Sequence, residues 1–153
     1  MVKLIDAHTH IQLPAFDADR DAVLMRAKNA GIGMILSGTQ AASSRSAIAI
    51  AQQHPGWVWA SVGFHPNHCD EAWHHDKNEQ HEDVQEQFDA DEFRVLAAHP
   101  SVVAIGECGF DAYRVASEDD RDAHIARQRD VFVAQLEIAR AVGKPIVIHC
   151  RSA

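Results

Sequence analysis

His8 and His10 stand two residues apart, directly after the apolar run at residues 2–5. Side chains two residues apart on a strand point to the same face, so the two imidazoles are presented side by side. Imidazole is the commonest protein ligand for a divalent metal. Asp6 shares that face and is placed to orient a ligand or to add an oxygen ligand. The spacing therefore predicts part of a metal site, with two polar loop residues as the plain alternative.

Polar side chains also end three later apolar runs, at His65, Glu107 and His149. Taken singly, each has a structural alternative: Glu107 as a buried carboxylate paired with an arginine, and His149 as a core histidine. The carboxyl ends of parallel strands meet at one edge of a sheet or barrel, which is where active sites lie. We therefore expect these three side chains to join His8 and His10 in one site.

Two arginines and one histidine are candidates for contact with a substrate. Arg151 lies two residues beyond His149, on the same face if the strand continues, where its guanidinium can bind a phosphate oxygen. His65 and Arg114 are the other candidates, and for Arg114 a solvated surface position is the alternative.

The elements that must position these residues alternate between strand and helix. Short apolar runs predict strands, and helical spacing with capping residues and Gly or Pro stops predicts helices. The predicted strands are 2–5, 34–36, 58–62, 102–105 and 145–148, and the predicted helices are 17–30, 43–53, 91–99 and 117–142. This βαβαβαβαβ order indicates an α/β fold with a parallel sheet and right-handed crossovers. Strand 2–5 is apolar apart from Lys3, as expected for a strand covered on both faces.

Two of these helices carry specific sequence signals. Ser117-Glu118-Asp119-Asp120 resembles a capping box at the start of the last helix. The buried stripe of that helix is predicted at Ile125, Phe132, Leu136 and Ala139 from their helical spacing.

Composition restricts the class of protein. The 153 residues fit one domain, and a formal net charge of −8 argues against a generally basic nucleic-acid binder, so phosphate recognition must be local. Three widely spaced cysteines, Cys69, Cys108 and Cys150, favour a reducing compartment over a disulfide framework. The N-terminus does not resemble a signal peptide, and no apolar stretch approaches the length of a membrane span. We expect a cytoplasmic protein with no membrane contact.

Residues 69–90 differ in composition from the rest of the chain, being acidic and rich in histidine. Their spacing repeats no ligand geometry, so a solvated insertion is favoured over a metal-binding tract. Because this segment follows the strand that leads to His65, it is placed to line the entrance of the site.

Together, four motifs resemble the TatD-related metal-dependent hydrolases. They are Asp6-Ala7-His8-Thr9-His10, Gly63-Phe64-His65-Pro66, Gly106-Glu107-Cys108-Gly109-Phe110-Asp111 and Pro145-Ile146-Val147-Ile148-His149-Cys150-Arg151. The resemblance implies a (β/α)₈ TIM-type barrel and a phosphodiesterase, often a DNase, with one or two metals. It assigns metal binding to His8, His10, Glu107 and His149, with Glu107 as the bridging catalytic carboxylate if two metals are present.

This chemistry is reasonable on first principles. Two divalent ions about 3.5–4 Å apart can activate a water and stabilise the leaving oxygen of a phosphodiester. Nitrogen and carboxylate ligands suit zinc or manganese, and magnesium where oxygens dominate. The expected substrate is therefore DNA or another phosphodiester.

Only about the first five strands and four helices of such a barrel are contained in residues 1–153, which we expect to form one partial barrel domain. The resemblance also implies a histidine after a sixth strand and a water-activating aspartate after a seventh. An unclosed sheet has unpaired edges, so self-association or pairing with a barrel half is expected. Two alternatives stay open: another amidohydrolase-type barrel acting on C–N or ester bonds, and a truncated, inactive chain that binds a metal or a partner.

Overall fold

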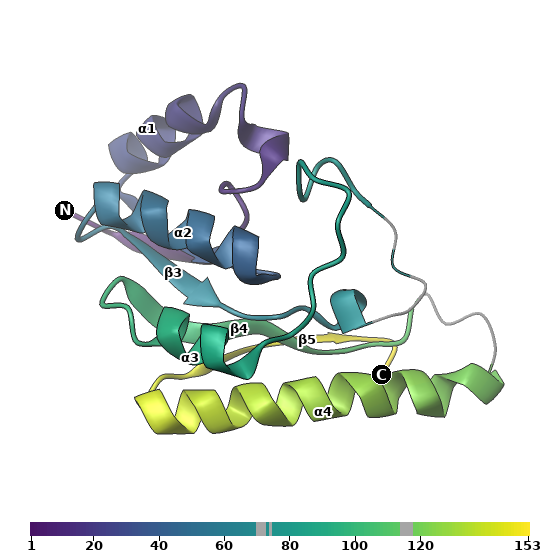
Figure 1. Cartoon of the computed structure of the whole chain (residues 1–153). Helices are drawn as coiled ribbons and strands as arrows, with labels where there is room; N and C mark the ends of the chain where they lie inside the picture. Colours follow the sequence, from purple (N-terminus) through teal and green to yellow (C-terminus); the bar gives the residue numbers. More distant parts are fainter. Residues whose placement is uncertain (70–72, 74, 114–117) are drawn as a thin grey trace.

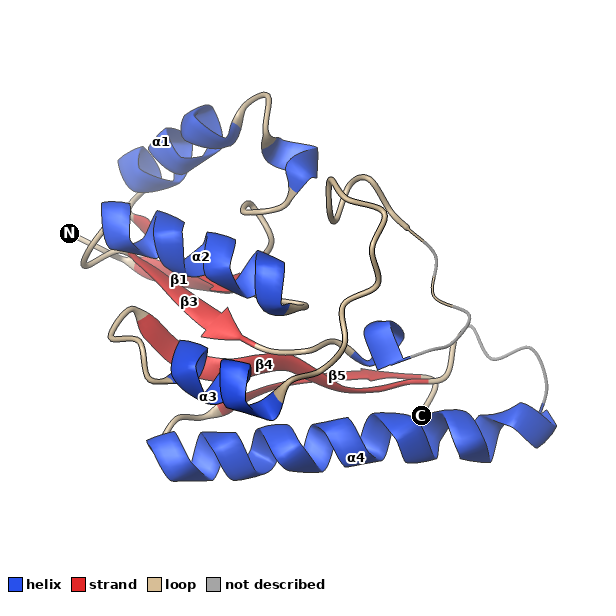
Figure 2. Cartoon of the chain, in the orientation of Figure 1, coloured by secondary structure: helices blue, strands red, loops and turns tan. Residues whose placement is uncertain are grey.

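Five parallel strands run side by side in the order of the sequence (Figure 2). They are β1 (Leu4–Thr9), β2 (Ile32–Ser37), β3 (Val58–Val62), β4 (Val102–Asp111) and β5 (Ile146–Arg151). The computed structural model describes residues 1–69, 73, 75–113 and 118–153. A strand order that never reverses is that of a barrel wall, whereas a doubly wound sheet reverses at a switch point. The α/β fold with the first five strands of a barrel is confirmed.

The helices follow one another round the curled sheet (Figure 1). They are α1 (Arg20–Ala30), α2 (Ala41–Gln53), α3 (Ala90–Ala97) and α4 (Glu118–Val142), with short 3-10 turns η1 (Pro14–Phe16) and η2 (Pro66–Cys69). Asp89 starts α3 by accepting hydrogen bonds from two backbone N–H groups of its first turn. Gly31 ends α1 in the left-handed conformation at φ 77°. Ser117, the first residue of the predicted capping box, lies outside the described residues.

The hydrophobic core lies between the sheet and these helices. Its fully buried members come from β2, β3, β4 and every helix, and they include Leu24, Leu36, Ala47, Val58, Val62, Phe93, Ile105 and Ile138. None of the described helices has the length and apolarity needed to cross a bilayer.

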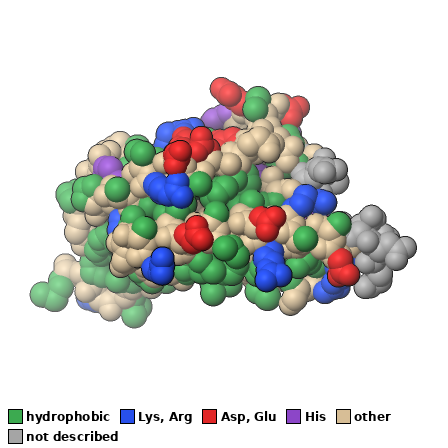
Figure 3. Space-filling view, turned by 60° about the horizontal axis from the view of Figure 1, so that its bottom comes forward, with side chains coloured by type: hydrophobic (Ala, Val, Ile, Leu, Met, Phe, Trp, Pro, Cys, Tyr) green, Lys and Arg blue, Asp and Glu red, His purple; other side chains and the backbone are tan. Residues whose placement is uncertain are grey.

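The buried face of α4 differs from the predicted one. Ala139 is buried as expected, but Leu136 is 39% exposed, and two glutamines, Gln128 and Gln135, are each only 1% exposed. The two amides face the strand ends, where backbone groups need hydrogen-bond partners. Mixed charged and apolar side chains cover the outward side of the α4 region (Figure 3).

Strand β1 is not covered on both faces, contrary to the prediction. Leu4 and Ile5 are 69% and 53% exposed, and Ile148 on β5 is 64% exposed. These two strands are the edges of the five-stranded sheet, so each has a neighbouring strand on one side only. An apolar edge strand is a natural template for further pairing.

Three strands extend three or more residues beyond their predicted carboxyl ends, and this determines where the site residues lie. β1 reaches Thr9, β4 reaches Asp111 and β5 reaches Arg151. In the β4–β5 pairing, Gly109 is opposite His149 and Asp111 is opposite Arg151. Most of the side chains predicted to form the site are therefore held on strands and not on loops.

Candidate metal centre

Seven polar side chains converge at the carboxyl edge of the sheet. They come from the ends of β1, β3, β4 and β5 and are His8, His10, His65, Glu107, Asp111, His149 and Arg151. All candidate ligands predicted from the sequence are brought together here. Arg114, predicted as a substrate contact, lies outside the described residues.

The first group consists of His8, His10 and Glu107. Nε2 of His8 lies 2.9 Å from Oε2 of Glu107 and 3.1 Å from Nε2 of His10. Nε2 of His10 lies 3.5 Å from the same carboxylate oxygen. Two imidazole nitrogens and a carboxylate oxygen within this range form a set that can hold a divalent ion.

The second group consists of His65, Asp111 and His149. His149 lies between two carboxylates, with Nδ1 2.7 Å from Oε1 of Glu107 and Nε2 3.0 Å from Oδ2 of Asp111. Nε2 of His65 lies 3.7 Å from Oε1 of Glu107. These are the two ligand groups in the described part of the chain.

Glu107 connects the two groups because its carboxylate oxygens face in different directions. Oε2 faces His8 and His10, whereas Oε1 faces His149 and His65. A carboxylate so placed can contribute one oxygen to each of two neighbouring ions, which is the geometry of a bridging ligand.

The backbone around His10 selects its tautomer. Nδ1 of His10 lies 2.9 Å from the carbonyl oxygen of Ser37. Since a carbonyl only accepts, Nδ1 carries the proton when the ring is neutral, and Nε2 then has a lone pair directed into the site. Such a second hydrogen bond is the usual support of a metal-binding histidine.

His65 has the opposite tautomer. The backbone N–H of Asn67 donates to Nδ1 of His65 at 3.1 Å, so the proton of the neutral ring is on Nε2. Burial lowers the pKa of His65 to about 3, even though the charge of Glu107 acts in the other direction. A neutral ring with Nε2–H facing the site is a hydrogen-bond donor, which suits contact with a substrate oxygen.

The carboxylates are held in their charged form by the groups around them. Burial opposes ionisation of Glu107, but His10 and the neighbouring histidines lower its pKa to about 2. Burial also lowers the pKa of His10, yet its hydrogen bond to Glu107 and the charge of that carboxylate outweigh it and raise the pKa overall. The site therefore presents anionic oxygen to a cation.

Two glycines let β4 approach β5 closely enough to bring Glu107 beside His149. Gly106 has φ 137° and Gly109 has φ 144°, which disfavour residues with a side chain. A Cβ on Gly109 would meet the carbonyl oxygen of His149 at 2.1 Å, and one on Gly106 would meet that of Val147 at 2.4 Å. The Gly-Glu-x-Gly spacing thus has a steric cause.

Arg151 is held at the edge of the site by Asp111. Its Nε and Nη2 lie 2.9 Å and 2.6 Å from Oδ2 of Asp111, and the guanidinium carbon lies 4.6 Å from the centre of the Tyr113 ring. Burial raises the pKa of Asp111, but the bond from Arg151 and further hydrogen bonds lower it overall. Because β5 continues to residue 151, Arg151 does lie on the face predicted for it.

Two glutamines of α4 support the strand ends and were not singled out from the sequence. The side-chain amide of Gln128 accepts from the backbone N–H of Asp111 at 2.9 Å and donates to its carbonyl at 2.8 Å. Gln135 does the same at Phe64, accepting at 2.8 Å and donating at 3.1 Å. Each amide thus fixes the backbone at, or next to, a member of the second ligand group. Their seven-residue spacing is the only sequence signal that could have found them.

The acidic segment predicted to be a solvated insertion is docked against the site in its described part. Glu79 lines a cavity of about 240 Å³ together with His10, His65, Glu107 and His149. Glu86 accepts hydrogen bonds from the backbone N–H groups of Ala41 and Ala42 at the start of α2. As expected, the segment contributes to the entrance of the site.

Fold and site together define one class: a barrel-type α/β protein with a histidine–carboxylate centre at the carboxyl ends of its strands. The family model described as TatD related DNase matches residues 5–153. The chain belongs to this family of TatD-related proteins, as the motifs predict.

Individual relatives agree with this assignment. A protein of Erwinia tasmaniensis named 3'-5' ssDNA/RNA exonuclease TatD is 36% identical over 151 residues, covering 98% of this chain and 51% of that protein. One of the same name from Musicola paradisiaca is 38% identical over 151 residues, covering 98% and 50%. The crystal structure of YjjV, a TatD homologue from Escherichia coli K12, has a TM-score of 0.71 at 28% identity, covering 97% of this chain and 51% of that one. The chain spans about half the length of these relatives.

Proposed function

We propose that this chain carries the metal-binding half of a nuclease that hydrolyses phosphodiester bonds in single-stranded DNA or RNA. The observation that carries the proposal is the carboxylate of Glu107, whose two oxygens face two separate ligand groups. Relatives named as 3'-5' ssDNA/RNA exonucleases support the substrate class. Amide or ester hydrolysis at a related barrel remains the competing activity, and a chain that binds metal without turnover is the non-enzymatic alternative.

The proposed ligands are His8, His10 and Glu107 for one ion, and Glu107 with Nδ1 of His149 for a second. Asp111, which faces Nε2 of the same ring, is an addition to the set expected from the sequence and is proposed to orient that ring. The donor set is nitrogen and oxygen only, because the buried Cys108 thiol is directed to the carbonyl of Val147. Such donors suit Mn²⁺, Zn²⁺ or Mg²⁺. When bound, the ions would supply an activated water and charge stabilisation at the phosphate.

The remaining polar residues are proposed to bind the phosphodiester. His65, neutral and protonated on Nε2, donates a hydrogen bond to a phosphate oxygen. Arg151 places a guanidinium beside the second ligand group, where it contributes positive charge to the same phosphate. Arg114 is kept as a proposed substrate contact on the sequence argument alone.

The activity is tested by offering one metal-loaded preparation several substrates. We expect shortening of 5'-labelled single-stranded DNA and RNA in the presence of Mn²⁺ or Mg²⁺, with no release from a p-nitrophenyl ester or an anilide. Cleavage of the ester or anilide alone would instead establish the amidohydrolase-type alternative. Binding of metal with no cleavage of any substrate would establish the non-enzymatic one.

The exposed apolar residues of β1 and β5 support a partner at the sheet edges. We propose that Leu4, Ile5 and Ile148 are covered by a second copy of the chain or by the other half of a barrel. Light scattering across a concentration series tests self-association, and co-expression with the C-terminal half of a relative tests the second arrangement.

Residues 1–153 are proposed to act as one partial barrel domain. The odd number and wide spacing of the three cysteines in the sequence support a reducing compartment such as the cytoplasm.

A further inference from the structure

A cavity beside the candidate metal centre is formed by the acidic segment and by two helix starts. It measures about 520 Å³ and is bounded by residues 12–20, by the outer side of α2 and by residues 79–86. Leu13 and Glu79 line both this cavity and the metal pocket, so the two spaces are neighbours. We call the larger space the α2 pocket. Its volume lies in the range of small-molecule sites.

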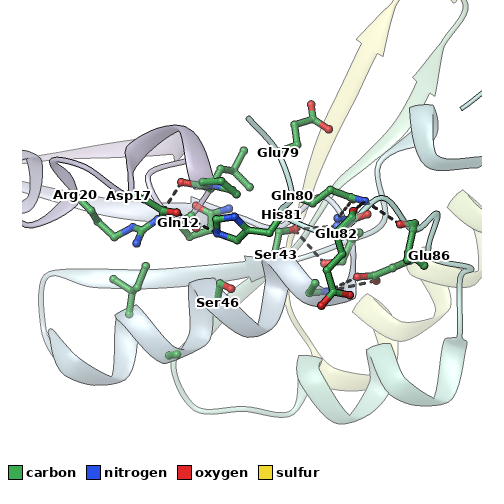
Figure 4. A pocket seen from close by; sticks show the side chains of 17 residues that line it. Gln12, Asp17, Arg20, Ser43, Ser46, Glu79, Gln80, His81, Glu82 and Glu86 are labelled. Carbon is green, nitrogen blue, oxygen red and sulfur yellow. Dashed lines mark hydrogen bonds and ion pairs between the residues drawn. The ribbon is translucent and has the colours of Figure 1, made fainter. Parts of the chain in front are cut away.

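The cations at the α2 pocket are already paired, which argues against a phosphate site. Arg20 donates to the carbonyls of Ile11 and Leu13 and to the carboxylate of Asp17. Nε2 of His81 lies 3.0 Å from the other oxygen of Asp17. Figure 4 shows Arg20, Asp17 and His81 gathered at one end of the pocket.

The start of α2 is closed to phosphate as well. A helix N-terminus is an anion site because of its unpaired N–H groups. Here the carboxylate of Glu86 accepts hydrogen bonds from Ala41 and Ala42, at the opposite end of the pocket from Arg20 (Figure 4). An anion entering the pocket would therefore meet an existing carboxylate.

The wall of the pocket combines apolar surface with hydrogen-bond acceptors. Leu13, Pro14, Ala49, Ile50 and Val84 provide the apolar part. The acceptors are the carboxylates of the segment and two buried amides, Gln12 and Gln40, which are 5% and 1% exposed. Within the described part of the chain, Oε1 of Gln12 has no hydrogen-bond partner. An unsatisfied buried acceptor is stabilised by a ligand that donates to it.

From these observations we infer that the α2 pocket binds a nucleobase bearing an exocyclic amino group, cytosine or adenine, of the nucleic acid held at the metal centre. The inference rests on the proposed function for the identity of the substrate. A base is planar, largely apolar on its faces and uncharged, and an amino group donates hydrogen bonds to the acceptors in the wall. Thymine presents a carbonyl oxygen where cytosine presents that amino group, so the pocket discriminates between them.

The test uses nucleosides, which carry no phosphate and need no metal. The ¹⁵N-labelled chain is titrated with deoxycytidine and, separately, with thymidine, while amide signals are followed. We expect deoxycytidine to shift the signals of Ala42, Ala49 and Val84, and thymidine to bind about fivefold more weakly, the equivalent of one hydrogen bond. Shifts confined to Thr39 and Asn67 of the metal pocket, equal binding of both nucleosides, or no shifts would overturn the inference.

A filling variant and a matched control locate the binding. Ala49 is exposed and lines the pocket, so Ala49→Trp should fill it and weaken deoxycytidine binding by about tenfold or more. Ala98→Trp makes the same change at an exposed position away from the pocket and should bind as the unaltered chain does. If Ala49→Trp does not fold, Ser46→Phe, at another exposed lining position, replaces it. If a folded filling variant binds deoxycytidine as tightly as the unaltered chain does, the assignment of the base to this pocket is wrong.

A third titration separates this inference from the proposed function. Inorganic phosphate with Mg²⁺ should shift the signals of Thr39 and Asn67, which line the metal pocket. If phosphate with Mg²⁺ causes no shifts but deoxycytidine does, the result counts against the proposed nuclease. The nucleoside titration then still decides whether the α2 pocket binds a base. Failure of the nucleoside titration alone leaves the metal centre standing and removes the base site.

Discussion

The carboxylate of Asp111 and the guanidinium of Arg151 form an ion pair across neighbouring strands, with 2.6 Å between Oδ2 and Nη2. The carboxylate is buried, whereas the arginine side chain is partly exposed. The same oxygen lies 3.0 Å from Nε2 of His149. Asp111 is thus shared between a candidate ligand and a cation, so the charge of Arg151 is fixed next to the second ligand group.

Arg151→Lys tests the role of this fixed guanidinium. Lysine keeps the charge but cannot make the two bonds that Nε and Nη2 make to Asp111. We expect the affinity of the metal-loaded chain for inorganic phosphate to fall about tenfold, with little change in the number of bound ions. Calorimetric titration measures both. Arg94→Lys, an exposed ion-paired arginine of α3, is the control, and equal phosphate affinity in the two variants would remove Arg151 from the proposed phosphate contacts.

Glu107→Gln tests whether one carboxylate serves both ligand groups. The amide has one acceptor oxygen in place of two and carries no charge, so it cannot bridge two cations. We expect metal affinity to fall at both groups, by at least about tenfold each, as measured by titration with Mn²⁺ or Zn²⁺. The control variant Glu92→Gln, on the surface of α3, should bind Mn²⁺ or Zn²⁺ with the same affinity as the unaltered chain. Loss of a single ion with full retention of the other would show that Glu107 belongs to one group only.

Gln128 and Gln135 are expected to contribute stability as well as position. Replacing either by Leu leaves a buried backbone N–H and C=O without partners, at about 1–3 kcal/mol of unfolding free energy for each unpaired group. Urea unfolding of Gln128→Leu and Gln135→Leu measures this loss. Gln87→Leu, at an exposed position, should change stability little. Gln128→Leu should in addition weaken metal binding through Asp111, and stability indistinguishable from the control would refute the paired-amide interpretation.

The candidate histidine ligands were predictable because their chemistry and their positions agree. His8, His10 and His149 are metal-binding residue types at the ends of apolar runs, and strand ends in a parallel sheet meet at one edge. The strand order followed from the same alternation of runs and helices. Asp111 was quoted in a motif but not assigned, because the predicted fourth strand stopped at residue 105 and the actual one continues to residue 111.

The support from α4 was not predictable from hydrophobic periodicity. The stripe was assigned through Phe132 and Leu136, whereas the buried face carries Gln128 and Gln135. A glutamine on a helix ordinarily indicates a solvated position. Their seven-residue spacing puts both amides on one face of α4, but that this face is buried follows from the strand-end backbone groups opposite, which need hydrogen-bond partners.

The three cysteines should differ widely in reactivity. Burial, and secondly the charge of Glu107, raise the pKa of Cys108 to about 12 from 9.0, so its thiolate fraction near pH 8 falls about a thousandfold. Cys150 is exposed and Cys69 half-buried. We expect iodoacetamide to label Cys150 first and Cys108 only on unfolding, as followed by peptide mass spectrometry. The variant Cys150→Ser provides the reference, and rapid labelling of Cys108 in the folded chain would contradict its burial.

His68 should make the metal-free chain less stable in mild acid. The side chain is buried, and burial lowers its pKa to about 4 from 6.5. Between these values the unfolded chain binds the proton and the folded chain does not, so stability present above pH 6.5 is lost as the pH falls toward 4. His68 then accounts for a loss of about 2 kcal/mol between pH 6.5 and pH 5, since each pH unit corresponds to about 1.4 kcal/mol per proton. Glu107 adds to the loss only below about pH 4.5, because its pKa is lowered to about 2.

The variant His68→Phe isolates this effect. Phenylalanine keeps an aromatic ring against Phe64 but cannot take up a proton. We expect the urea midpoint of the variant to change less between pH 6.5 and pH 5 than that of the unaltered chain, by an amount equal to about 2 kcal/mol in unfolding free energy. Val95→Phe, which adds an aromatic ring at an exposed position without a titratable group, is the control and should leave the slope unchanged. His65 also makes the folded chain less stable in acid, because burial lowers its pKa to about 3. We therefore expect the unfolding free energy of the His68 variant to keep some dependence on pH. A slope as steep as in the unaltered chain would mean that His68 is protonated in the folded state, and hence that Glu79, whose Oε2 lies 3.9 Å from its Nε2, outweighs burial there.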